Sequence, residues 1–98
     1  MSHYYEAHIT VEPVFGERLE HFKEICAKQD FHVADLYMLK RKEDTPERSR
    51  YDTFCTGRDT DFTNLQNRMA ILRVLLDRHA FKIWRYKIES TIIDVRVN

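Results

Sequence analysis

Side chains that can handle a proton and an anion alternate near the N-terminus, at Glu6, His8 and Thr10. In an extended strand, residues two apart point to the same face, so these three side chains share one face. Arg85 and Lys87 have the same spacing near the C-terminus. An imidazole beside fixed cations binds an anion and moves a proton, which is the chemistry of phosphoesters. We therefore predict a ligand-binding site that consists of Glu6, His8, Arg85 and Lys87.

A purely structural role explains the same charged residues. Opposite charges on neighbouring strands stabilise a sheet, so Glu6 opposite Arg85 or Lys87 needs no ligand. Charged side chains also keep an exposed sheet face solvated. The two interpretations differ only in whether something binds to this face.

The segment Ala7-His8-Ile9-Thr10-Val11 resembles the His-x-Thr strand motif of the 2H phosphoesterases. The resemblance covers about five of the 98 residues. It implies that His8 and Thr10 are catalytic, with His8 as general acid or base and the Thr10 hydroxyl holding a phosphate. That family brings two such motifs together, whereas the second half of this chain has Phe54 where a His is needed. A phosphodiesterase site therefore requires a second His8 and Thr10 from another copy, as in a symmetric dimer.

Other catalytic and ligand-binding motifs are missing from the sequence. Cys26 and Cys55 form no Cys-x-x-Cys pair, and we interpret them as reduced, buried apolar residues. The histidines lack the helical spacing of a metal pair. Gly16 and Gly57 are isolated, so no Gly-rich phosphate loop exists. We expect no metal and no cofactor.

The first half of the chain predicts a strand, a helix and a strand. Apolar and polar residues alternate over 4–12, with Tyr5, Ala7, Ile9 and Val11 on one face. An apolar stripe with helical spacing covers 15–29, at Phe15, Leu19, Phe22 and Cys26. A second strand is expected over 31–40, with Asp35 and Tyr37 on the polar face, followed by a hairpin loop of mixed charge.

The second half repeats this order. A third strand is expected over 50–58. Thr60, Asp61 and Thr63 then offer N-cap oxygens, and Thr63-Asn64-Leu65-Gln66 fits a capping box at the start of a helix that runs to 79. A fourth strand covers 81–88, with Trp84, Tyr86 and Ile88 toward the helices. We expect a bend or bulge over 89–91, because the whole apolar stretch is longer than a usual strand, and a short strand over 93–97.

The two halves correspond in sequence, since Tyr5-Glu6 to Thr10 matches Tyr51-Asp52 to Thr56 and Phe31 matches Phe81. Two strand–helix–strand units joined by a hairpin are typical of the α+β ferredoxin-like sandwich. Right-handed crossovers then place the first and third strands in the centre and both helices on one face. We predict one such domain over residues 1–98.

Composition limits the classes of function. Sixteen basic residues balance sixteen acidic residues, so nothing draws the whole chain to nucleic acid or an anionic membrane. No stretch is apolar enough to span a bilayer and no signal peptide is evident, which predicts a cytoplasmic protein. We expect a small binding or regulatory module that forms a homodimer and takes a small anion or a protein on its open sheet face. The alternative is the 2H-like phosphodiesterase built around His8 and Thr10.

Overall fold

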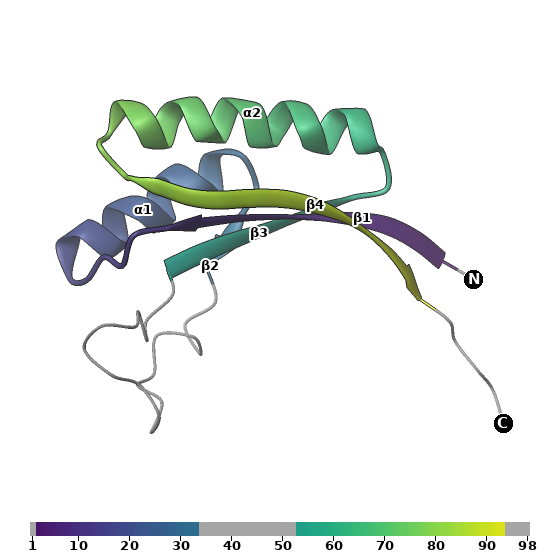
Figure 1. Cartoon of the computed structure of the whole chain (residues 1–98), viewed down its shortest axis with the longest axis horizontal. Coiled ribbons are helices and arrows are strands. Elements are labelled where there is room, and N and C mark those ends of the chain that lie inside the picture. Colours follow the sequence, from purple (N-terminus) through teal and green to yellow (C-terminus); the bar gives the residue numbers. More distant parts are fainter. Residues whose placement is uncertain (1, 34–52, 94–98) are drawn as a thin grey trace, which may run out of the picture.

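Two helices cover one face of a four-stranded antiparallel sheet in the computed structural model (Figure 1). The structure describes residues 2–33 and 53–93. The elements are β1 (Ser2–Val11), α1 (Glu17–Lys28), β2 (His32–Val33), β3 (Thr53–Asp59), α2 (Phe62–Arg78) and β4 (Ile83–Ile93). The strand order is β2-β3-β1-β4, with β1 and β3 in the centre. The predicted α+β ferredoxin-like arrangement is confirmed.

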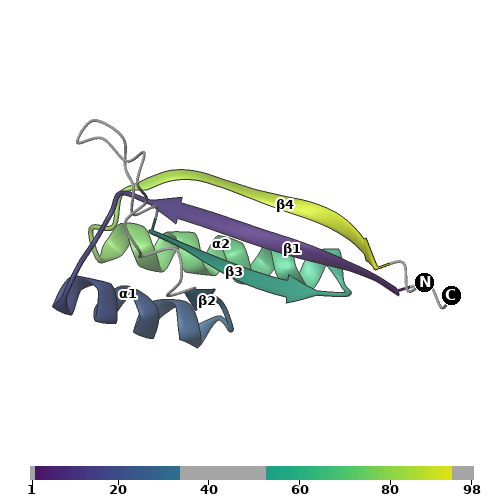
Figure 2. The ribbon, with the colours of Figure 1, turned by 90° about the horizontal axis from the view of Figure 1, so that it is seen from below.

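Alternation along β1 and helical spacing in α1 and α2 build the core. Ala7, Ile9 and Val11 are fully buried on the helix side of β1, as the sequence predicts. The buried residues of the helices are Phe22, Ile25 and Cys26 of α1 and Leu65, Met69, Leu72 and Leu76 of α2. Both cysteines are free and buried. The opposite sheet face carries none of this packing and is open in Figure 2.

The internal repeat predicted from the sequence is geometrically regular. A shift of about 46 positions relates β1 to β3, and the sheet register obeys it: His8 pairs with Thr56, and Thr10 pairs with Phe54. Phe54 therefore occupies the place in β3 that His8 occupies in β1. An approximate two-fold axis between Ile9 and Cys55 therefore relates β1 to β3.

Both helices end in the same way. The backbone φ is positive at Asp30 and at Ala80, one residue past each C-cap. The next residue, Phe31 or Phe81, donates its N–H to a carbonyl five residues earlier, at 3.0 and 2.9 Å. This is the Schellman motif, and in each half it turns a phenylalanine back into the core.

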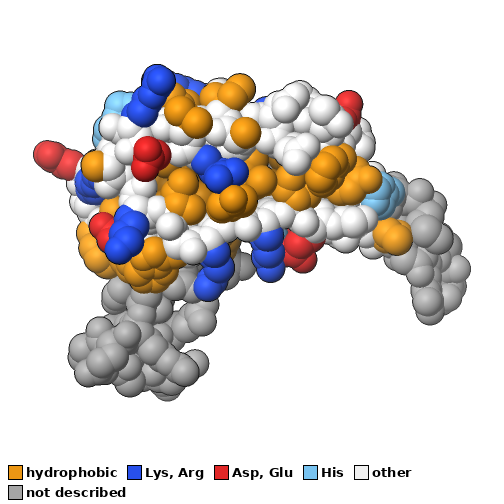
Figure 3. All heavy atoms as spheres, turned by 45° about the horizontal axis from the view of Figure 1, so that its top comes forward, with side chains coloured by type: hydrophobic (Ala, Val, Ile, Leu, Met, Phe, Trp, Pro, Cys, Tyr) orange, Lys and Arg blue, Asp and Glu red, His pale blue; other side chains and the backbone are white. Residues whose placement is uncertain are grey.

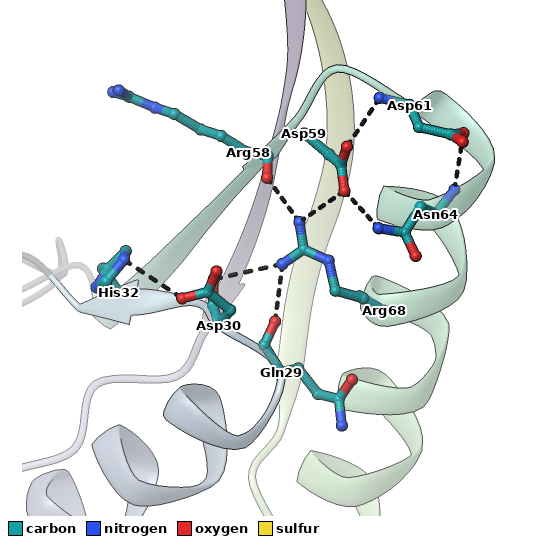
Figure 4. A network of polar contacts seen from close by, with 8 residues as sticks. All are labelled: Gln29, Asp30, His32, Arg58, Asp59, Asp61, Asn64 and Arg68. Atoms are coloured by element: carbon teal, nitrogen blue, oxygen red, sulfur yellow. Dashed lines mark hydrogen bonds and ion pairs between the residues drawn. The ribbon is translucent and has the colours of Figure 1, made fainter.

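One arginine of each helix binds the C-terminal end of the other helix. Arg68 of α2 donates to the carbonyl of Gln29 at 2.8 Å and to that of Arg58 at 2.6 Å (Figure 4). Arg18 of α1 donates to the carbonyls of His79 and Ala80 at 2.9 and 2.6 Å. A guanidinium supplies several donors at once and complements the negative end of a helix. The two arginines thus join the helices to each other and fix the end of β3.

Two predicted boundaries are wrong. Of the N-cap oxygens that the sequence offers, that of Asp61 caps α2 by accepting the N–H of Asn64; the helix begins at Phe62, two residues before the capping box at Thr63 would place it. α1 begins at Glu17, and Phe15 precedes it with 56% of its surface exposed.

The predicted bulge is also misplaced. β4 is continuous from Ile83 to Ile93, and the register shift lies at Trp84, between the partners of Thr10 and Val11. Tyr86 lies on the helix side of the sheet as expected, opposite Ile9, but neither it nor Trp84 enters the core: 47% and 48% of their surfaces are exposed, because β4 is an edge strand.

Some predictions fall outside the described residues. These are the second strand beyond Val33 with Asp35 and Tyr37, the hairpin loop, the start of the third strand over 50–52 and the strand over 93–97 beyond Ile93. Within the part that the structure describes, no helix is long and apolar enough to cross a membrane.

Candidate functional site

The open sheet face carries polar side chains in three rows that run across the strands. The register places Glu89, Glu6 and Arg58 in the first row and Lys87, His8, Thr56 and His32 in the second. The third row is Arg85, Thr10 and Phe54. All ten side chains line one shallow hollow of about 510 Å³. The predicted ligand residues Glu6, His8, Arg85 and Lys87 are therefore brought together, with Thr10 beside them.

His8 lies at the centre of this face and is held by three neighbours. Its Nε2 is 3.1 Å from Glu6 Oε1 and 3.3 Å from Glu89 Oε1, and its Nδ1 is 3.2 Å from Thr56 Oγ1. Because Nε2 faces two carboxylates, it must carry a proton. In the neutral ring, Nδ1 then accepts the Thr56 hydroxyl proton. Both ring nitrogens of His8 are thus engaged by protein groups.

The two carboxylates beside His8 form ion pairs on their outer sides. Glu6 and Glu89 are directly opposite each other, an arrangement that is repulsive by itself. Arg58 Nε lies 2.7 Å from Glu6, and Lys87 Nζ lies 3.0 Å from Glu89. The Lys87 ammonium, by hydrogen bond and by charge, holds the pKa of Glu89 below its usual range, and His8 adds to this. The first two rows therefore balance their own charges.

The third row differs, because its cation, Arg85, has no counter-charge among the residues that the structure describes. The Arg85 side chain makes no hydrogen bond or ion pair with any residue in the ranges 2–33 and 53–93. Thr10, its direct neighbour on β1, is only 6% exposed, and its hydroxyl has no hydrogen-bond partner among the described residues. Phe54 lies on the other side of Thr10. This corner offers a cation, a hydroxyl and an aromatic ring to whatever enters the hollow.

Several expectations about individual contacts need correction. Glu6 pairs with Arg58, not with Arg85 or Lys87, because the first row aligns these two residues directly. His8 is opposite Lys87 in the sheet, yet its ring contacts carboxylates instead of cations.

Five lining residues were not predicted as part of the site: His32, Phe54, Thr56, Arg58 and Glu89. The sequence carries a signal for four of them. Glu89 continues the spacing of Arg85 and Lys87, and alternation along the third strand, where Thr53, Cys55 and Gly57 are buried, sends Phe54, Thr56 and Arg58 to the open face. For His32 the sequence predicts the wrong face, because Asp35 and Tyr37, an odd number of positions away, were expected on the polar face, whereas His32 pairs with Thr56 and lines the hollow.

The described ranges contain no group of three or more His, Cys, Asp or Glu side chains that could hold a metal ion. The carboxylates and His8 satisfy one another together with Arg58 and Lys87. The chemistry this face offers is therefore hydrogen bonding and charge, strongest around Arg85.

Comparison with known proteins finds no matching family model, no similar curated protein and no similar solved structure. The resemblance of His8 and Thr10 to one 2H motif accordingly stays a prediction. The chemistry of the hollow is the basis for proposing a function.

Proposed function

We propose that this protein is a small binding or regulatory module that takes a small anion, free or carried by a protein, in the hollow of its open sheet face. The observation that carries the proposal is Arg85, a cation with no counter-charge among the described residues, beside the unpartnered Thr10 hydroxyl. A guanidinium binds phosphate or carboxylate through two parallel hydrogen bonds, and a hydroxyl adds a third donor.

The rest of the hollow favours placing the anion at this corner. Glu6 and Glu89 repel an anion from the first row, whereas the third row contains no acidic side chain. Positions two apart along a strand are separated by roughly 7 Å, so a ligand bound at Thr10 also reaches His8. An anion with an apolar or aromatic part fits best, because Phe54 provides a wall for it.

Calorimetric titration with inorganic phosphate, and then with adenosine monophosphate, tests the proposal. Arg85→Gln is expected to weaken binding about tenfold or more, since a hydrogen bond to a charged group contributes about 1.5–3 kcal/mol. Arg73→Gln is the matched control, because Arg73 lies over the Tyr86 ring on the helix side of the sheet. Equal affinities for the wild type and Arg85→Gln, or no binding to the wild type, would contradict the proposal.

A second candidate function is the 2H-like phosphodiesterase. What favours it is that His8 and Thr10 are neighbours in one hollow. Against it, Phe54 holds the equivalent place in β3, so the second motif must come from another copy. Turnover of 2′,3′-cyclic nucleotides that His8→Ala abolishes would establish this activity; binding without turnover would favour the module.

We also propose that the protein forms a homodimer. We also propose a cytoplasmic place of action, because two free, buried thiols suit a reducing compartment.

A further inference from the structure

The outer edge of β4 is the longest unpaired edge among the described strands. β4 has eleven residues, and of the described strands it pairs with β1 alone, along its inner edge (Figure 2). An open edge presents a row of backbone N–H and C=O groups to any other strand, and β4 contains no proline to prevent pairing.

Exposed apolar side chains accompany this edge. Trp84, Tyr86 and Ile92 of β4 have 48%, 47% and 59% of their surfaces exposed. Hydrophobic side chains form a band over α2 and the neighbouring sheet edge in Figure 3. A second strand laid along β4 would cover part of this surface.

We propose that β4 pairs with β4 of a second copy, antiparallel, with Ile88 opposite Ile88 of that copy, so that the two sheets become one. This pairing specifies, and rests on, the self-association part of the proposed function. Anion binding at Arg85 does not depend on it.

Charge complementarity selects this register. With the two-fold axis at Ile88, Lys87 lies opposite Glu89 of the second copy on the open face, and the pair occurs twice. An axis at Lys87 or at Glu89 sets a residue against its own like charge, and an axis at Tyr86 sets Arg85 against Lys87. Like charges directly opposite are destabilising, and opposite charges are stabilising. The Ile88 axis gives the longest overlap without a like-charge pair.

The same register also places other apolar side chains of β4 opposite one another. Ile88 lies opposite Ile88 of the second copy and Trp84 lies opposite Ile92, whereas Tyr86 lies opposite Ser90. In such a sheet the two His8 residues are three strand spacings apart and offset by two residues along the strands, roughly 16 Å in all, which is too far to share one phosphate. The edge pair therefore supports a binding module with two separate hollows over the alternative phosphodiesterase.

Cysteine cross-linking of the full chain tests the register. Directly opposite Cα atoms in an antiparallel pair are about 4.5–5.5 Å apart, within the range of a disulfide. With copper phenanthroline as oxidant, Ile88→Cys is expected to give a covalent dimer. Tyr86→Cys is the matched control and is expected to give no covalent dimer, because position 86 lies opposite Ser90 of the second copy. The native cysteines are buried and do not compete. Cross-linking at 86 but not at 88, or at neither, overturns the proposal.

Charge exchange tests the pair itself without new cysteines. Sedimentation velocity at high micromolar concentration is expected to give a dimer for the wild type and at least tenfold weaker self-association for Lys87→Glu and for Glu89→Lys. Mixing the two variants restores opposite charges at both sites and is expected to restore the dimer.

The mixture separates the proposal from damage within one chain, because loss of the internal Lys87–Glu89 pair is not repaired by mixing. A monomeric wild type or an unrestored mixture overturns the edge pair. Phosphate titration at dilute protein, where only monomer exists, reports separately on the hollow.

Discussion

Removing the Arg68 side chain should destabilise the fold more than removing any other arginine of the helices. Arg68 lies between the C-terminal end of α1 and the end of β3 (Figure 4), and only 17% of its side chain is exposed. It donates to the Gln29 and Arg58 carbonyls at 2.8 and 2.6 Å and lies 3.5 Å from the Asp59 carboxylate. No water can replace all three contacts in the same geometry.

The magnitude follows from the two short hydrogen bonds. Each hydrogen bond to a charged donor contributes about 1.5–3 kcal/mol, and partial access of water to the vacated carbonyls reduces the sum. We expect Arg68→Ala to lower the free energy of unfolding by about 2–4 kcal/mol, a large part of the 5–15 kcal/mol usual for a domain. Arg18→Ala should cost less, about 1–2 kcal/mol, because Arg18 is exposed and its carbonyl partners can turn to water.

Equilibrium urea unfolding followed by circular dichroism measures both changes. Arg78→Ala, in the last turn of α2, is the control and should cost below about 1 kcal/mol through the helix dipole alone. Arg68→Lys keeps the charge but cannot bridge both segments, and should fall between the wild type and Arg68→Ala. Equal unfolding free energies for Arg68→Ala and Arg78→Ala would refute the reasoning.

Three further predictions concern the same half of the molecule. The Asp61 N–H and the Asn64 amide hold the pKa of Asp59 below its usual range; the stability it adds is complete above about pH 4 and lost as pH falls through the lower folded pKa. Asp59→Asn should therefore flatten the decline of urea midpoints below about pH 4, and an unchanged decline would count against this. Gly57→Ala places a Cβ 2.7 Å from the buried Phe31 ring and should cost about 1–3 kcal/mol in urea unfolding, which Phe31→Leu should partly relieve. Asp61→Ala removes the α2 cap and should cost about 1 kcal/mol; a thermal midpoint equal to that of the wild type would contradict the cap.

Local patterns were enough to predict the sheet face that carries the hollow. Alternation along β1 assigns Glu6, His8 and Thr10 to the open side, and the match between the two halves sets β3 beside β1. The contacts within the hollow depend on register, which alternation does not determine. Alternation therefore predicts that Glu6 has a cationic partner, but it does not identify Arg58 as that partner.

The helix ends were harder to predict for a different reason. Arg18 and Arg68 are 50 positions apart, the same separation as Phe31 and Phe81, so the repeat contained a signal. Their acceptors at the helix ends are the carbonyls of Gln29, His79 and Ala80, at the turns where Asp30 and Ala80 adopt positive φ. Neither residue is glycine, and nothing local marks them for that conformation.

Phosphate-induced shifts of the backbone amide resonances test the central claim most directly, namely that the hollow binds a small anion at its third row. In a two-dimensional NMR titration of the full chain with inorganic phosphate, the account predicts saturable shifts at Thr10, Phe54 and Arg85. Val74, on the exposed face of α2, should not move. Shifts confined to the helices, or none at any phosphate concentration, would contradict it.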